Sequence, residues 1–328
     1  MRLLSSSIAL CLCLASPALS ADERPKQLLI VSFDGAGPNH LWQRSRDFAK
    51  NNNAHFTYFL SCTLLIPRAE RSTYQGPGHK PGRSNIGFAQ TKDEARERLS
   101  HIWQAHQEGH DISSHTCGHF DGKDWSAADW SAEMTTFSRV LGNAWTAVGA
   151  GESEPDGWKD FVANDIHGFR APYFSTSAGM TVAEKKAGFT YDASLVTKGP
   201  MMPEEEDGLI RFGLPLIPEG PSQRPIIAMD YNLFIRHSGG IDHPSKGDEF
   251  AERSYAAFKT AFETQYNGDR QPLQIGLHFV TMNGGAYWRA MERLVSEVCN
   301  RDDVACVSYK QAIPMIGERR KAKATSGL

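Results

Sequence analysis

Long apolar runs, an excess of positive charge and internal repeats are all missing from this 328-residue sequence. No segment approaches the roughly 20 apolar residues that a membrane-spanning helix requires, so we expect no membrane span. Lysine and arginine total 35 against 38 aspartate and glutamate, which argues against nucleic acid as a partner. Because no repeat or linker divides the chain, we expect one large domain.

The N-terminal residues have the pattern of a secretory signal peptide. Arg2 precedes an apolar run at residues 8–14, and the small residues Ala18 and Ser20 follow it. We expect cleavage after residue 20, a single domain over residues 21–328, and a secreted or periplasmic location.

Cysteine is scarce, with six residues in the whole chain and four after residue 20. Export permits disulfides, and the short separation of Cys299 and Cys306 predicts a bridge between them. Cys117 is expected to be a small buried side chain, with a soft metal ligand as the alternative.

Apolar runs predict buried parallel strands, and segments with helical spacing predict helices between them. The predicted strands are residues 26–33, 55–62, 111–114, 166–169, 189–192, 226–229, 273–279 and 305–308. The predicted helices are residues 41–50, 92–108, 126–147, 181–187 and 287–299. This alternation favours an α/β barrel or a wound sheet.

Two segments, residues 67–90 and 198–225, are too long for plain connections. They are expected either to shape a substrate groove or to form mobile surface excursions. The basic tail, residues 319–328, is expected to be frayed.

Polar side chains follow the ends of five predicted strands. They are Asp34, the pair His115 and His119, Arg170 with Tyr173, Asp192, and His278. In barrel enzymes the carboxyl ends of the strands carry the catalytic groups, so these residues are expected at one rim. Two histidines in a His-x-x-x-His spacing can bind one metal ion.

As a set, these motifs resemble the polysaccharide deacetylases with a NodB homology domain (carbohydrate esterase family 4), in particular the chitin deacetylase-like clade. The matching segments, in the same order, are residues 32–34, 115–119, 170–173, 191–192 and 277–279. The resemblance implies a distorted, incomplete (β/α)7 barrel of the NodB type.

The resemblance also implies a role for each residue. His115 and His119 would bind a divalent metal, usually zinc. Asp34 would be the general base, kept ionised by Arg170, and His278 the general acid, oriented by Asp192. The backbone N–H of Tyr173 would help to stabilise the oxyanion, as in other acyl-transfer sites.

The chain departs from the family pattern at Gly35, where the family has a metal-binding aspartate. Since a catalytic zinc normally has three protein ligands, two histidines should bind it weakly. Asp34 itself, His40 or Asp111 could supply the third ligand.

The resemblance therefore implies a metal-dependent hydrolase, with zinc as the expected metal, that removes acetyl groups from an N-acetylated polysaccharide or oligosaccharide, such as chitin, peptidoglycan or poly-N-acetylglucosamine. One alternative, favoured by Gly35, is a catalytically inactive glycan-binding relative. An O-acetyl esterase on the same scaffold is another. A structural exported protein with vestigial motifs is the third.

Overall fold

A curled sheet forms the centre of the computed structural model, which describes residues 24–325. The predicted signal peptide, residues 1–20, lies outside the described residues. The strands are β1 Gln27–Asp34, β2 Thr57–Leu60, β3 Asp111–Ser114, β4 Gly168–Phe169, β5 Tyr191–Thr197, β6 Glu204–Glu206, β7 Leu209–Glu219, β8 Arg224–Ile227, β9 Leu273–His278 and β10 Val304–Cys306.

Parallel strands follow one another around the sheet in the order β9-β1-β2-β3-β4-β5-β7. A gap remains between β7 and β9. In the described residues it is bridged at residues 228–229, which follow β8. There the Ala228 N–H donates to the Pro215 carbonyl, and the Gly276 N–H donates to the Ala228 carbonyl. The expected distorted, incomplete (β/α)7 barrel is therefore confirmed.

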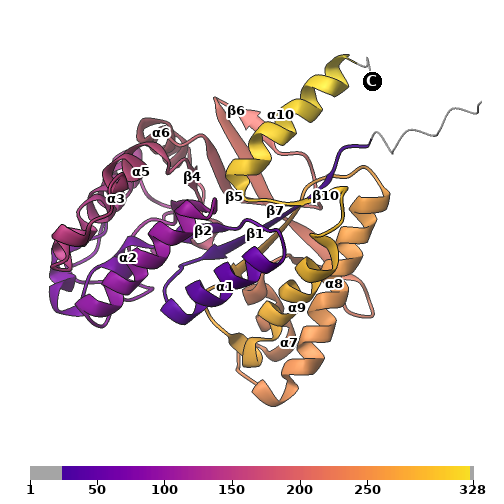
Figure 1. Ribbon diagram of the computed structural model, residues 1–328, viewed down its shortest axis with the longest axis horizontal. Coiled ribbons are helices and arrows are strands. Elements are labelled where there is room, and N and C mark those ends of the chain that lie inside the picture. Colours follow the sequence, from indigo (N-terminus) through magenta and orange to yellow (C-terminus); the bar gives the residue numbers. More distant parts are fainter. Residues whose placement is uncertain (1–23, 326–328) are drawn as a thin grey trace, which may run out of the picture.

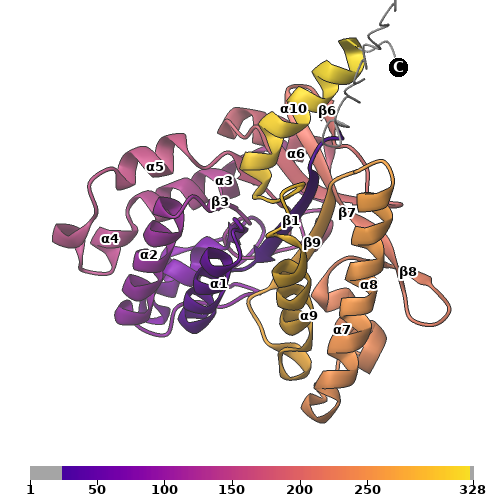
Figure 2. The ribbon, with the colours of Figure 1, turned by 45° about the vertical axis from the view of Figure 1, so that its right-hand side comes forward.

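Helices surround the sheet, as Figures 1 and 2 show. They are α1 Asn39–Asn51, α2 Lys92–Gln107, α3 Ala127–Gly142, α4 Ala144–Ala147, α5 Trp158–Asn164, α6 Ala178–Ala187, α7 Asp230–Ser238, α8 Gly247–Asn267, α9 Met282–Val298 and α10 Tyr309–Thr325. The described residues also form five short 3-10 helices, η1 Cys62–Leu65, η2 Arg68–Thr73, η3 Gly151–Ser153, η4 Pro172–Phe174 and η5 Pro244–Lys246. None of the helices in the described range is long and apolar enough to cross a membrane.

Alternation along β1 separates two cores, as expected for a strand with both faces buried. Leu29, Val31 and Phe33 face the main core of the molecule. Leu28 and Ile30 belong to a second core, which also contains the apolar side chains of α10. Because Asp34 is in phase with Leu28 and Ile30, its carboxylate is directed into the barrel.

Local sequence signals fix several helix starts. Thr91 caps α2 by accepting a hydrogen bond from the Glu94 N–H. Ser126 and Asp129 form a reciprocal capping box at the start of α3. The helix predicted over residues 126–147 is interrupted at Asn143, which separates α3 from α4.

Two expectations about the elements are wrong, and one helix was missed. Residues 198–225 are largely an antiparallel ribbon of β6, β7 and the start of β8, not a loop. Helix α8, which has 21 residues, was not predicted. Residues 319–325 of the expected frayed tail are helical, as the end of α10, and residues 326–328 lie outside the described residues.

Candidate active site

Strand ends bring the predicted catalytic side chains together at one rim of the barrel. Asp34 ends β1 and His278 ends the neighbouring β9, where the two residues are register partners. His115 follows β3, and Arg170 follows β4. The predicted grouping at the carboxyl ends of the strands is therefore present for these four residues.

Asp34 and Arg170 form a buried ion pair. Arg170 Nη1 donates to Asp34 Oδ1 at 2.7 Å, and the two side chains are 0% and 4% exposed, respectively. Burial raises the pKa of Asp34, but the positive charge of Arg170 and its hydrogen bond outweigh this effect, so the pKa lies below its usual value. Asp34 is therefore a carboxylate at neutral pH.

His115 is held in one tautomer by the backbone of Arg170. Its Nδ1 lies 2.7 Å from the Arg170 carbonyl oxygen. Since a carbonyl only accepts, Nδ1 carries the proton and Nε2 presents a lone pair. Burial lowers the pKa of His115 to about 3, so the ring is neutral at physiological pH. A neutral imidazole with a free nitrogen and a hydrogen-bonded second nitrogen is the usual form of a metal-ligating histidine.

His119 lies beside His115, with a ring-centroid distance of 4.9 Å, and its other face contacts Tyr173. Burial and the charge of His278 lower the pKa of His119. Both His119 and Tyr173 have left-handed backbone, with φ of 54° and 59°. This conformation costs a non-glycine residue on the order of 1–3 kcal/mol and is concentrated at functional sites.

The partner of His278 is Asp230, not Asp192 as expected. Asp230 Oδ1 lies 2.7 Å from His278 Nδ1, and Oδ2 accepts from the His278 N–H at 2.8 Å. Burial lowers the pKa of His278, but the charges of Asp230 and Asp34 outweigh it, so the pKa is raised. Asp230 follows a predicted strand, residues 226–229, which marks it as a candidate in the sequence but does not select it over Asp192.

Asp192 serves a different, structural purpose. It accepts hydrogen bonds from Arg211 at 2.8 Å and from the Ser194 N–H at 3.0 Å. The Ser194 hydroxyl, which also contacts Asp192, accepts from the Ala171 N–H at 2.8 Å. Asp192 thus supports the segment that follows Arg170 and does not contact His278.

The loop that carries both histidines is fixed by two features that were not predicted. Cys117 forms a disulfide with Cys62 in η1, so it is neither a free buried thiol nor a metal ligand. Glu133 of α3 accepts from the N–H groups of Cys117 and Gly118, each at 3.0 Å. The structure also joins Cys299 to Cys306, the pair expected to form a bridge.

Gly35 has a left-handed backbone, with φ of 73°. A Cβ built on it would lie 2.6 Å from Ile86 Cδ1, closer than any real contact. The side chain of Ile86, from the segment 67–90, therefore fills the space into which a residue at position 35 would extend.

A third metal ligand is not assembled beside the two histidines. Within residues 24–325, no three His, Cys, Asp or Glu side chains form a cluster that could hold a metal ion. Asp111 begins β3, at the opposite end of that strand from His115, and its carboxylate is bound by Tyr191 and Thr57. Asp111 is therefore excluded as the replacement ligand. His40 is exposed in the first turn of α1.

The segment 67–90 is ordered and lies against the site. The Asn85 N–H donates to the Gly118 carbonyl at 2.8 Å, between the two histidines in sequence. Asn85 Nδ2 lies 3.4 Å from the Tyr173 hydroxyl. This segment therefore contacts the loop that carries the two histidines, and its part in shaping a substrate groove stays a prediction.

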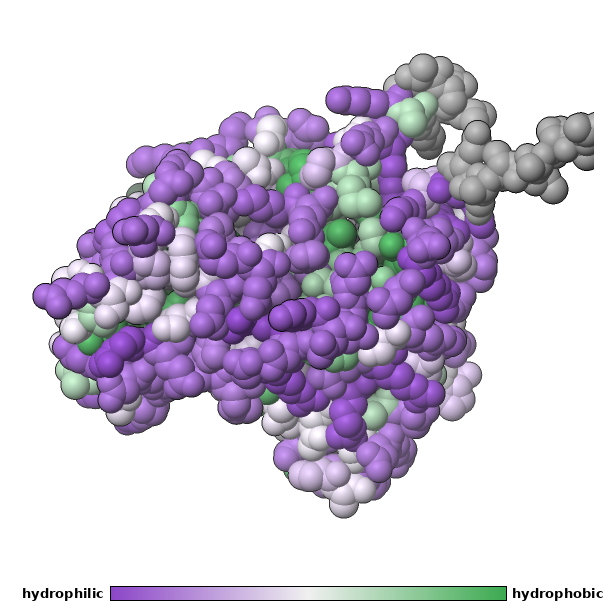
Figure 3. All heavy atoms as spheres, in the orientation of Figure 1, coloured by the Kyte–Doolittle hydropathy of each residue, from purple (hydrophilic) through white to green (hydrophobic). Residues whose placement is uncertain are grey.

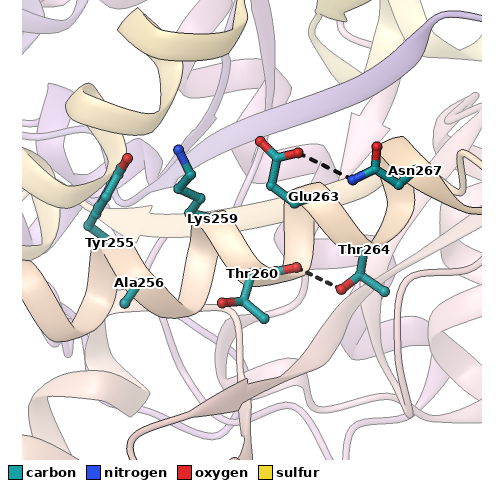
Figure 4. Close-up of a pocket in the computed structure, with 7 residues that line it drawn as sticks. All are labelled: Tyr255, Ala256, Lys259, Thr260, Glu263, Thr264 and Asn267. Atoms are coloured by element: carbon teal, nitrogen blue, oxygen red, sulfur yellow. Dashed lines mark hydrogen bonds between the residues drawn. The ribbon is translucent and has the colours of Figure 1, made fainter.

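A separate hollow of about 620 Å³ lies along the outer face of α8. Its side chains all come from that helix and partly bond one another, as Figure 4 shows for Asn267 and Glu263. None of the residues discussed above lines it.

Comparison with solved structures identifies the fold. The chain aligns with a structure named "putative polysaccharide deacetylase from Mycobacterium smegmatis" at a TM-score of 0.56 and 16% identity, over 93% of this chain and 95% of that one. A carbohydrate esterase family 4 domain of a xylanase from the hindgut metagenome of Trinervitermes trinervoides aligns at a TM-score of 0.46 and 14% identity, over 90% and 92%. A peptidoglycan deacetylase from Bacillus subtilis aligns at 0.47 and 10%, over 92% and 96%.

No family model matches the sequence, and no curated protein matches it either. The first structural alignment shows that the chain has the fold of a polysaccharide deacetylase of the NodB type.

Proposed function

We propose that the protein is a metal-dependent deacetylase of acetylated polysaccharides. The observation that carries the proposal is the assembly, at one rim of a deacetylase-like barrel, of an ionised carboxylate, two neutral imidazoles and a protonatable imidazole. Asp34, His115, His119 and His278 are these groups. Such a set provides base, metal ligands and acid for amide hydrolysis.

Two imidazoles would hold a divalent metal, and the described residues place no third ligand beside them. Nε2 of His115 is free of the hydrogen bond that occupies Nδ1, and the ring of His119 adjoins it. Zinc is the expected ion, because it is bound well by imidazole. When bound, it would supply Lewis acidity to the acetyl carbonyl and lower the pKa of water.

The side chains then divide the proton transfers. Arg170 occupies Oδ1 of Asp34, so the second carboxylate oxygen takes the proton from the attacking water. His278, whose Nδ1 is held by Asp230, donates from Nε2 to the leaving amine. The products are acetate and a free amino sugar, and the proton balance closes through these two groups. The Tyr173 N–H remains the proposed oxyanion donor.

The test is acetate release from N-acetylated oligosaccharides, combined with zinc calorimetry. We expect Asp34→Asn and His115→Ala each to abolish turnover, and His115→Ala also to abolish zinc binding. His167→Ala is the control, because His167 precedes β4, at the end of that strand away from Arg170. Near-normal turnover in Asp34→Asn would refute the mechanism. Release of acetate from O-acetylated but not N-acetylated glycans would instead indicate an esterase.

A second candidate is a glycan-binding protein without activity, favoured by Gly35, which offers no ligand and where an added Cβ would lie 2.6 Å from Ile86 Cδ1. Because no third ligand is grouped with the histidines in the described residues, zinc affinity decides between the two. Retained glycan binding without specific zinc binding would support this second candidate.

A further inference from the structure

A cavity of about 520 Å³ lies within the segment 67–90 and is lined by three arginines, Arg68, Arg71 and Arg83. All three side chains are exposed. None of them forms an ion pair with a carboxylate in the described range, and the one acidic residue of the segment, Glu70, pairs with Lys92 at 2.7 Å. The arginines are therefore available to a ligand.

The positive charge of this segment contrasts with that of the whole protein. Residues 67–90 contain four lysines and arginines and one acidic residue, whereas the chain as a whole has a net charge of −3. Arg71 packs beside Gly82 in the cavity lining, since a Cβ built on Gly82 would lie 3.2 Å from the Arg71 Cγ. The guanidinium group recognises carboxylates and phosphates through paired hydrogen bonds.

The cavity shares its wall with the candidate active site. Ser84 and Ile86 line it. The hydroxyl of Ser84 lies 3.4 Å from the Gly118 carbonyl in the histidine loop, and Ile86 abuts Gly35. The arginine cavity and the candidate active site therefore adjoin each other through Ser84 and Ile86.

We propose that this arginine cavity binds an anionic substituent of the glycan, so that the substrate is an acidic acetylated polysaccharide and not a neutral one such as chitin. The inference rests on the proposed function and deepens it by naming the substrate class. A carboxylate or a phosphate on a sugar next to the reacting one satisfies the same guanidinium groups.

The experiment is calorimetric binding of three oligosaccharides of equal length to the full chain carrying Asp34→Asn, which prevents turnover. The first is neutral and N-acetylated, the second carries a carboxylate on one sugar, and the third a phosphate. We expect one or both acidic ligands to bind about tenfold more tightly than the neutral one, because each exposed ion pair contributes about two- to fivefold. This preference should decrease as salt is raised.

Arg68→Gln, Arg71→Gln and Arg83→Gln, combined in one variant, should remove the preference and leave neutral binding unchanged. Glutamine retains part of the apolar stem, so the packing is largely preserved. Arg139→Gln on α3 is the matched control, since Arg139 is also an exposed arginine. A phosphate-only or carboxylate-only preference identifies the substituent, and both outcomes support the inference.

Equal affinity for all three ligands, or a preference that survives in the triple variant, would overturn the inference. This result is distinct from failure of the proposed function. An arginine-dependent preference without acetate release by the unmodified protein would refute the hydrolase and leave the anionic cavity established.

Discussion

Gly35→Asp alone is predicted to destabilise the protein and not to create a good metal site, although it restores the residue type of the family pattern. An aspartate with φ near 73° costs about 1 kcal/mol, at the low end for a left-handed non-glycine residue. Its Cβ would lie 2.6 Å from Ile86 Cδ1, and moving that side chain off its rotamer costs about 0.5–1.5 kcal/mol more. The sum, about 2 kcal/mol, corresponds to a decrease in Tm of about 3 °C for a chain of this size.

Ile86→Ala should relieve the contact, so the two substitutions are expected to be coupled. A double-mutant cycle by thermal unfolding should give a favourable coupling of about 1 kcal/mol between positions 35 and 86. In the double variant, zinc should bind about tenfold or more tightly than in Ile86→Ala, since even groups outside the ligand set change metal affinity about 10–100-fold. A Gly35→Asp protein as stable as the parent, or zero coupling, would show that Ile86 does not obstruct this position.

Two further predictions concern the acid and the histidine loop. Asp230→Asn should lower kcat about 100-fold and move the alkaline limb of the pH profile to lower pH. The reason is that Asp230 raises the pKa of His278, so that His278 stays protonated at higher pH. Asp192→Asn is the control. An alkaline limb that moves only in this control would show that Asp192 is the partner of His278. Replacing Cys62 and Cys117 by serine should lower the free energy of unfolding by about 4 kcal/mol. This value is the loop-closure entropy for a disulfide whose cysteines are 55 residues apart. A loss below about 1 kcal/mol, measured by urea unfolding, would contradict the prediction.

Periodicity predicted much of the barrel because buried parallel strands are almost continuously apolar. The predicted strand at residues 26–33 corresponds to β1, and the one at 273–279 to β9. The ribbon within 198–225 was missed because its prolines suggest a loop. In β7, Pro215 still serves the sheet, since its carbonyl accepts from the Ala228 N–H. Proline lacks the donor but retains the acceptor.

Helix α8 could have been predicted, because its apolar residues recur at helical spacing. Phe250, Ala257, Phe258, Ala261 and Phe262 are all buried on one side of it. The tertiary partner of His278 could not have been predicted in the same way. Asp192 and Asp230 both follow strand-like segments, and only the three-dimensional closure places one of them beside β9.

Arg170 explains why the glycine at position 35 leaves the other proposed catalytic groups in place. The Arg170 guanidinium group donates to Asp34, to the Ser32 hydroxyl at 2.9 Å and to the Tyr309 hydroxyl at 2.8 Å. The backbone carbonyl of Arg170 fixes the tautomer of His115. The base and one imidazole are therefore oriented without any contribution from position 35. A buried ion pair contributes little net stability compared with apolar side chains of the same volume. The presence of this pair at the rim is accordingly better explained by a demand for an ionised carboxylate than by a demand for stability.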